Sequence, residues 1–166
     1  MPWAEVVVKF VDCHAVELCM RAYPGHPQGC PNVANKPGCP SVLYAPPLLL
    51  DVSKRVYAIW NAFDLAGHIA RMRALHTRWT ERQLVCCRYW QGGARKALRA
   101  EVRNWIQAGY PDRMLNEGGG FGIAGTPEAC GVDVSATMLT AGIKLEWPPR
   151  IVAYQVVLAG IINRGG

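Results

Sequence analysis

The sequence predicts a single compact α/β domain with a small mixed sheet, flanking helices and a cysteine- and proline-rich loop. Two observations predict this class: stretches rich in Val, Ile and aromatic residues stand near both ends of the chain, and segments with helical spacing of apolar residues lie between them. The chain has 166 residues, 51% of them apolar and 18% charged, which is enough to bury a core without staples. We therefore expect residues 1–166 to form one domain.

The first half of the chain contains two predicted strands with a long loop between them. Residues 3–11 are rich in Val and Phe and predict a buried strand, and residues 55–60 predict a second one. The cysteine- and proline-rich loop occupies about residues 13–50. An amphipathic helix is expected over about residues 64–76, because apolar residues recur there at helical spacing.

The second half predicts three further helices and a last strand. Thr80 and Gln83 make a capping box that begins a helix over residues 80–90, which Gly92 and Gly93 interrupt. The next helix has an apolar stripe and ends near Gly109, where Tyr110 and Pro111 close it; the stripe consists of Leu98, Val102, Trp105 and Ile106.

Residues 118–125, GGGFGIAG, predict a loop. Thr126 as N-cap and Pro127 as first helical residue predict a helix through about Leu139, and residues 150–158 predict the last strand.

Three cysteines, Cys19, Cys30 and Cys39, frame the segment CMRAYPGHPQGCPNVANKPGCP. Proline fixes φ and removes an amide donor, so neither a helix nor a strand continues through this segment and something other than a backbone ladder must hold it. A metal or an iron–sulfur cluster would supply that hold. The spacing lacks the paired C-x-x-C of zinc ribbons and the C-x-x-C-x-x-C run of ferredoxins, so a disulfide framework or three unrelated thiols remain alternatives.

The remaining composition indicates a reducing compartment and no membrane. The longest apolar run, residues 42–50, is broken by Pro46 and Pro47 and is too short to span a bilayer. The N-terminus carries Glu5, Lys9 and Asp12 among its apolar residues and has no signal-peptide pattern. We expect a cytoplasmic protein whose seven cysteines stay as thiols unless a metal binds them.

Two separated motifs resemble a known family. Cys19, the stretch YPGHPQGCPN that ends at Asn32, and Cys39-Pro40 resemble the Cys, CPN and CPP signature of small bacterial, archaeal and phage proteins described as predicted metal-binding proteins of unknown function. Ser41 departs from the second proline of CPP. Downstream, PEACGVDVSATMLTAG, residues 127–142, resembles the family's PEA-x-G-I/V-D/N-V helix entry.

The resemblance implies an iron–sulfur or zinc site and no known reaction. Relatives often carry a second cysteine cluster in the middle of the chain, where this sequence has only Cys86 and Cys87. We therefore expect one [4Fe-4S] cluster, with zinc as the alternative, bound by Cys19, Cys30, Cys39 and one of Cys86 and Cys87. Neighbouring helical residues point about 100° apart, so the other member of the pair is expected in the core.

His26, Cys13 and Cys130 each have their own predicted role. His26 either completes a zinc site with three cysteines or orients the loop and donates to a sulfur; for an iron–sulfur site we favour the second role. Cys13 is expected to be a small buried side chain. Cys130 is also expected to be buried and inert, with a reactive thiolate at a helix N-terminus as the alternative.

The net charge of +6 favours an anionic partner such as RNA or a nucleotide. Arg95, Lys96, Arg99 and Arg103 form a basic stripe that either contacts phosphates or is only a solvated face. Further arginines and interleaved tryptophans precede the stripe; the tryptophans either stack bases or fill the core. These residues are Arg71, Arg73, Arg78, Arg82, Arg88, Trp60, Trp79 and Trp90.

The predicted function is redox or sulfur-atom chemistry on an anionic substrate. A cluster with three protein thiolates leaves one iron open for substrate, whereas four thiolates close it and favour electron transfer or a structural role. The alternative is a non-enzymatic module in which zinc stabilises the proline-rich loop and the basic helices bind nucleic acid or a partner protein. No serine stands in a nucleophile-elbow context, so hydrolysis is not predicted.

Overall fold

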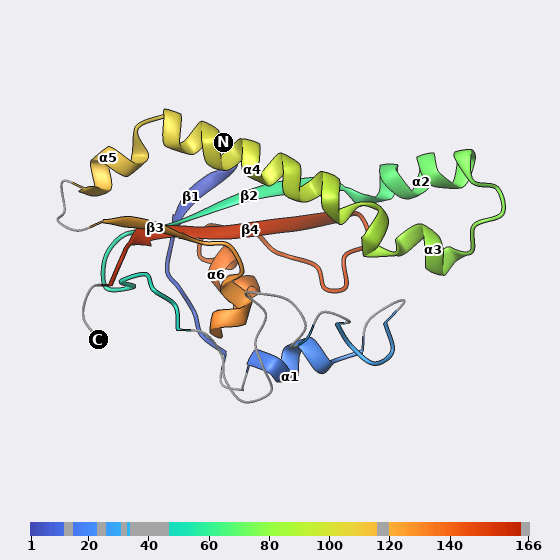
Figure 1. Cartoon of the computed structure of the whole chain (residues 1–166), viewed down its shortest axis with the longest axis horizontal. Helices are drawn as coiled ribbons and strands as arrows, with labels where there is room; N and C mark the ends of the chain where they lie inside the picture. The colour runs from blue at the N-terminus through green and yellow to red at the C-terminus, as the bar shows by residue number, and fades with distance from the viewer. Residues whose placement is uncertain (12–14, 23–25, 31–32, 34–46, 116–119, 164–166) are drawn as a thin grey trace.

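The described strands form an antiparallel sheet with helices on both faces (Figure 1). The structure is a computed structural model that describes residues 1–11, 15–22, 26–30, 33, 47–115 and 120–163. The strands are β1 (Trp3–Val6), β2 (Val56–Asp64), β3 (Phe121–Ala124) and β4 (Val152–Ile161). The helices are α1 (Ala15–Met20), α2 (Leu65–Leu75), α3 (Glu81–Val85), α4 (Gln91–Gln107), α5 (Tyr110–Leu115) and α6 (Val134–Leu139), with 3-10 turns η1 (Cys87–Tyr89) and η2 (Pro127–Cys130).

The sheet has the strand order β1-β2-β4-β3. Its centre is the long antiparallel pair of β2 and β4, in register from Val56 opposite Gly160 to Asp64 opposite Val152. Successive side chains on a strand point to opposite faces. Both faces are buried: Ala58 and Leu158 belong to one apolar cluster, whereas Ile59 and Val157 belong to another.

Helices α4 and α5 cover one face of the sheet, and α6 lies on the other (Figure 1). Trp105 of α4 is completely buried and packs with Ile59 and Met114. On the opposite face, Met138 of α6 is completely buried and packs in the same cluster as Val56 and Val156. The two clusters together give the layered core of this domain.

A third apolar cluster lies where β2 passes into α2. Leu65, Trp90, Ala94 and Ala153 are its buried members, and Cys87 packs against it. From this cluster the hairpin of α2 and α3 extends to one end of the molecule (Figure 1). Arg73 donates to both carboxylate oxygens of Glu81 at 2.8 Å, which links the two helices.

The predicted α/β class is confirmed, with one small sheet and flanking helices in a single domain. The sheet is antiparallel throughout rather than mixed. The helix predicted over residues 64–76 is α2, with the Asp64 carboxylate accepting from the amide of Gly67. The capping box of Thr80 and Gln83 is also present at the start of α3.

Several predicted boundaries are wrong. Strand β1 ends at Val6, because the amide of Val7 donates to the hydroxyl of Thr140 instead of to a neighbouring strand. Gly92 and Gly93 lie inside α4, where both face open space. Ile106 of the predicted stripe is 41% exposed.

Tyr110 and Pro111 begin α5 rather than closing a helix. Proline is tolerated in the first turn of a helix, where its missing amide hydrogen would have no helical partner.

The glycine-rich loop and the helix after it also differ from prediction. Residues 121–124 form β3, paired with β4, although a loop was predicted over residues 118–125. The helix predicted from Thr126 to Leu139 is two elements, η2 and α6, separated by Gly131 at φ +80°. The Asp133 carboxylate accepts from the amide of Ala136 and begins α6. Within the described residues, no helix is both long and apolar enough to cross a bilayer.

Candidate metal centre

A backbone hydrogen bond connects Cys19 and Cys30. Cys19 lies in the last turn of α1, a helix inside the segment predicted to be loop, and its carbonyl accepts from the amide of Cys30 at 2.7 Å. A turn precedes Cys30, closed by the Gly29 amide and the His26 carbonyl at 3.0 Å. Gly29 has φ +81°, and a Cβ there would lie 2.5 Å from the Cys19 carbonyl oxygen, so the close approach of the two cysteine segments requires glycine.

Cys86 and Cys87 lie in a bend rather than in a continuous helix. Helix α3 ends at Val85, Cys86 has extended backbone angles (φ −62°, ψ 121°), and Cys87 begins η1. The helix predicted over residues 80–90 is therefore interrupted, and the argument from 100° helical spacing does not apply to this pair. Both side chains are half-buried.

The bend brings Cys87 to the cysteine-rich segment. Its Sγ lies 3.8 Å from Nε2 of His26, within hydrogen-bonding range for sulfur. Burial raises the pKa of the Cys87 thiol, and the negative charges of the Cys86 and Cys30 thiolates raise it further. The Cys87 sulfur therefore lies beside the His26 ring, and the thiols of Cys30 and Cys86 are near enough for their charges to act on Cys87. Thiolates and imidazole are the ligands that soft and borderline metals prefer.

The predicted ligand set is only partly described. Cys39 lies outside the described residues, as does Cys13. Among the residues that the structure does describe, no three His, Cys, Asp or Glu side chains are close enough together to hold a metal ion. In the described part of the chain, Cys30, Cys86, Cys87 and Cys130 are free thiols.

Cys130 does not lie at the start of a helix. It is the last residue of η2, so no helical N-terminus lowers its pKa. Burial raises the pKa of its thiol, and the nearby Glu128 carboxylate raises it further. These effects favour an unreactive Cys130 thiol over a reactive thiolate.

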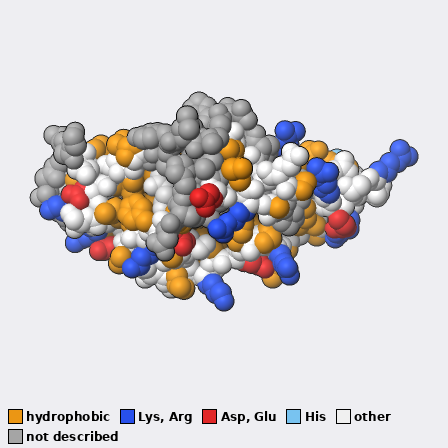
Figure 2. Space-filling view, turned by 90° about the horizontal axis from the view of Figure 1, so that it is seen from below, with side chains coloured by type: hydrophobic (Ala, Val, Ile, Leu, Met, Phe, Trp, Pro, Cys, Tyr) orange, Lys and Arg blue, Asp and Glu red, His pale blue; other side chains and the backbone are white. Residues whose placement is uncertain are grey.

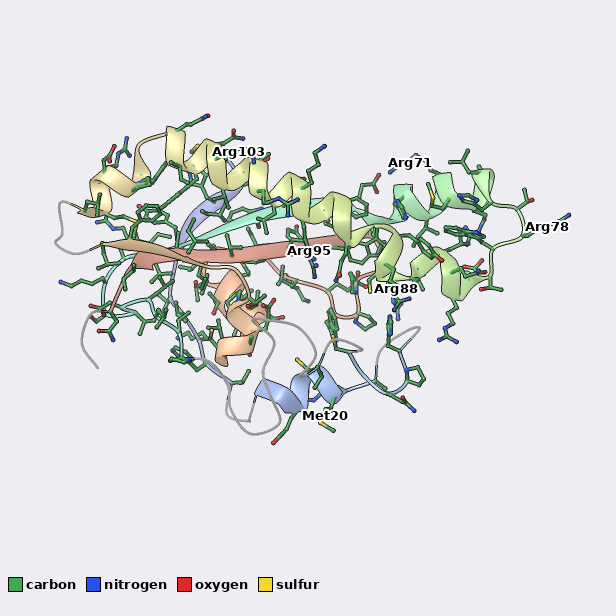
Figure 3. The ribbon with its side chains drawn as sticks, viewed as in Figure 1. Met20, Arg71, Arg78, Arg88, Arg95 and Arg103 are labelled. Carbon is green, nitrogen blue, oxygen red and sulfur yellow. The ribbon has the colours of Figure 1, made fainter. Side chains whose placement is uncertain are left out.

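The four residues of the basic stripe are all exposed on α4. Arg95 donates to the side chain of Gln91, and within the described part of the chain none of the four pairs with a carboxylate. Figure 3 shows Arg95 and Arg103 at different points along α4. On the face seen in Figure 2, Lys and Arg side chains are spread along the molecule with Asp and Glu among them.

The three interleaved tryptophans have different environments. Trp90 is buried in the third cluster, and Trp60 packs against the α6 side of the sheet. Trp79 instead stacks on His76, with ring centroids 4.1 Å apart, and contacts Tyr89 at 4.5 Å. Sequence reasoning missed this stack, although the spacing of three between His76 and Trp79 beside a turn was a usable signal.

The described part of the chain is an α/β protein with an antiparallel sheet, in which Cys87 contacts His26 of the cysteine-rich segment. No family model, curated protein or solved structure matches the chain. The resemblance to predicted metal-binding proteins therefore stays a prediction, carried by the cysteine motif and the segment over residues 127–142.

Proposed function

We propose that the protein binds one metal centre, a [4Fe-4S] cluster, through Cys19, Cys30, Cys39 and one of Cys86 and Cys87. The observation that carries the proposal is the 3.8 Å approach of the Cys87 sulfur to His26, which lies between Cys19 and Cys30 in sequence. Two segments about 60 residues apart thus contribute sulfur and nitrogen donors to one place.

Cys87 is the better candidate for the fourth ligand. Its thiol is next to His26 and within electrostatic reach of Cys30, and it packs against the apolar cluster of Trp90. A bound metal would stabilise the thiolate that burial now disfavours. His26 would then donate to the Cys87 sulfur and orient it, which is how ring nitrogens commonly support metal ligands.

Four thiolates close a cluster, so the proposed role is electron transfer within redox or sulfur-atom chemistry on an anionic substrate. When bound, the cluster supplies the electron. The substrate that the net charge of +6 favours is RNA or a nucleotide. The proposed location is the cytoplasm, where cysteines stay reduced and available to bind a metal. The second candidate is a zinc-stabilised binding module without enzymatic activity, which the His26 contact also favours, since zinc accepts mixed cysteine and histidine ligands.

Metal analysis and the visible spectrum of anaerobically purified protein test the proposal. A brown protein with broad visible absorption and several irons per chain is expected, whereas colourless protein with stoichiometric zinc would select the second candidate. Single Cys→Ser changes at Cys19, Cys30 and Cys39 should each remove most of the metal. Cys130→Ser is the matched control and should retain it, because the Cys130 thiol is shifted by Glu128 rather than by the other cysteines. Full occupancy in the Cys30→Ser protein would contradict the assignment.

The proposed anionic substrate has its own test on the basic stripe. Reversing Arg99 and Arg103 to Glu should weaken RNA binding and flatten its salt dependence, because each lost phosphate contact removes about one unit of slope. The measurement is fluorescence anisotropy with a labelled oligonucleotide at several salt concentrations. Wild-type protein without salt-dependent binding would remove RNA from the proposal.

A further inference from the structure

The hairpin of α2 and α3 carries an aromatic stack on its surface. His76 is the residue after α2, and the amide of Trp79 donates to the His76 carbonyl at 2.9 Å. This turn brings the rings of His76 and Trp79 face to face, nearly parallel at 9° with centroids 4.1 Å apart. Tyr89 of η1 continues the series, with its ring 4.5 Å from that of Trp79.

The stack is accessible to a ligand. His76 is exposed, Trp79 is half-buried, and Tyr89 is 51% exposed. None of the three belongs to the apolar clusters that form the core. The rings of His76 and Tyr89 both pack against Trp79, and these two rings are the exposed members of the stack. An exposed ring at the end of such a stack can accept a further planar ring.

Arginines surround the stack. Arg78 immediately precedes Trp79, Arg88 immediately precedes Tyr89, and Arg82 lies on α3 between them. All three are exposed, and in the described residues none forms an ion pair with a carboxylate. Figure 3 shows Arg78 at the outer end of the hairpin and Arg88 where the chain returns to the body, and Figure 2 shows basic side chains projecting from this end.

The hairpin is held in this shape by bonds that do not involve the stack. Arg73 and Glu81 join α2 to α3, and the capping box of Thr80 fixes the start of α3 immediately after Trp79. Trp90 at the base is buried in the third cluster. The hairpin that carries the stack is therefore ordered before any ligand binds, which lowers the entropic cost of binding.

We propose that this hairpin binds single-stranded RNA, with bases stacking on the exposed rings of His76 and Tyr89, which Trp79 supports, and phosphates contacting Arg78, Arg82 and Arg88. Aromatic platforms flanked by basic residues bind single strands because every base has a π face and every nucleotide a phosphate. The loops of RNA offer unstacked bases without prior melting, whereas a DNA duplex does not. The inference deepens the proposed function by naming its anionic partner and the place where it binds, yet it needs no metal at the cysteines.

Binding of a fluorescein-labelled twelve-nucleotide oligouridylate, measured by anisotropy, tests the proposal. Trp79→Ala removes the ring on which His76 and Tyr89 pack and should weaken binding by about 5- to 100-fold, the range expected for one lost base stack, with the salt slope unchanged. Arg78→Glu combined with Arg82→Glu should weaken binding and also flatten the salt slope. Trp147→Ala, which alters a tryptophan that is 72% exposed outside the hairpin, is the matched control and should bind as wild type does.

Two further measurements keep the outcomes distinct. Circular dichroism checks that each variant folds, and Trp79→Phe, which retains a ring, should recover most of the affinity. Unchanged affinity in Trp79→Ala, or an equal loss in Trp147→Ala, would overturn the proposal. Equal binding of oligodeoxythymidylate would overturn the assignment to RNA. Metal content measured on the same proteins separates this test from that of the metal centre, because loss of metal with intact RNA binding contradicts only the latter.

Discussion

The sulfur of Cys87 lies 3.8 Å from Nε2 of His26, although 61 positions separate the two residues in the chain. Cys87 is held by η1 against the cluster of Leu65, Trp90 and Ala153, and His26 begins the turn that leads to Cys30. The contact therefore connects the cysteine-rich segment to the core of the domain. It also decides which of two adjacent cysteines is the better candidate for a ligand.

Cys86 and Cys87 should differ in their effect on the metal. Cys87→Ser is expected to lower metal occupancy strongly or to change the cluster spectrum, because its sulfur faces His26. Cys86→Ser is the matched control and should cost only some stability. Metal content and visible absorption of the two anaerobically purified variants provide the measurement. Wild-type spectra in both variants and in the double variant would leave three protein thiolates and an open iron, which favours substrate-binding catalysis.

Cys87 in the metal-free protein should react slowly with iodoacetamide at neutral pH. The thiolate is the reactive form, and burial raises the pKa of this thiol above its ordinary value of 9.0. Half-maximal alkylation, followed by mass spectrometry of the peptide, is therefore expected above pH 9.0 in the folded protein and at the ordinary value in urea. Alkylation of folded protein with a midpoint below pH 9.0 would be inconsistent with this burial.

The raised pKa of the Cys87 thiol also makes the stability of the metal-free protein depend on pH. A thiol whose pKa is raised by folding stabilises the folded state fully below its unfolded pKa and loses that contribution as pH rises through the folded pKa. The metal-free wild type should lose stability above about pH 9.0, and part of that loss should vanish in Cys87→Ser. Metal affinity should change in the opposite direction, rising with pH, because binding requires the thiolate.

Gly29→Ala should reduce metal binding far more than a comparable change elsewhere. A methyl group at this position would lie 2.5 Å from the Cys19 carbonyl oxygen, which accepts from the Cys30 amide. Gly142→Ala is the matched control, since Gly142 has φ +77° but open space around it, and should cost about 1 kcal/mol of stability without loss of metal. Equal metal content in both variants would show that metal binding does not need the backbone hydrogen bond between Cys19 and Cys30.

Met138→Ala should destabilise the domain by about 2–5 kcal/mol, because Met138 is completely buried between α6 and the sheet. Its neighbour Leu139 is 60% exposed, and Leu139→Ala should change stability by no more than about 0.5 kcal/mol. Urea denaturation of the two variants measures both values. Similar losses in the two would contradict the packing of α6 on this face.

Local sequence determined the elements whose signals are short-range. Thr80 with Gln83 is a capping box recognisable from the sequence, and it begins a helix in the structure. The residues rich in Val, Ile and Tyr over 150–158 predicted β4, and this strand is buried on both faces of the sheet. The cysteines of the proline-rich segment are candidate ligands from their spacing together with the family resemblance, and this remains a prediction.

Tertiary packing decided the features that depend on distant partners. Residues 121–124 become a strand because β4 offers an edge, and Gly92 and Gly93 stay helical because Ala94 and Leu98 anchor α4 to buried clusters. Cys87 rather than Cys86 faces His26 because η1 follows a bend that no helical wheel predicts. Residue identity determines which side chains can bind a metal or stack a base, whereas long-range packing determines which of them meet.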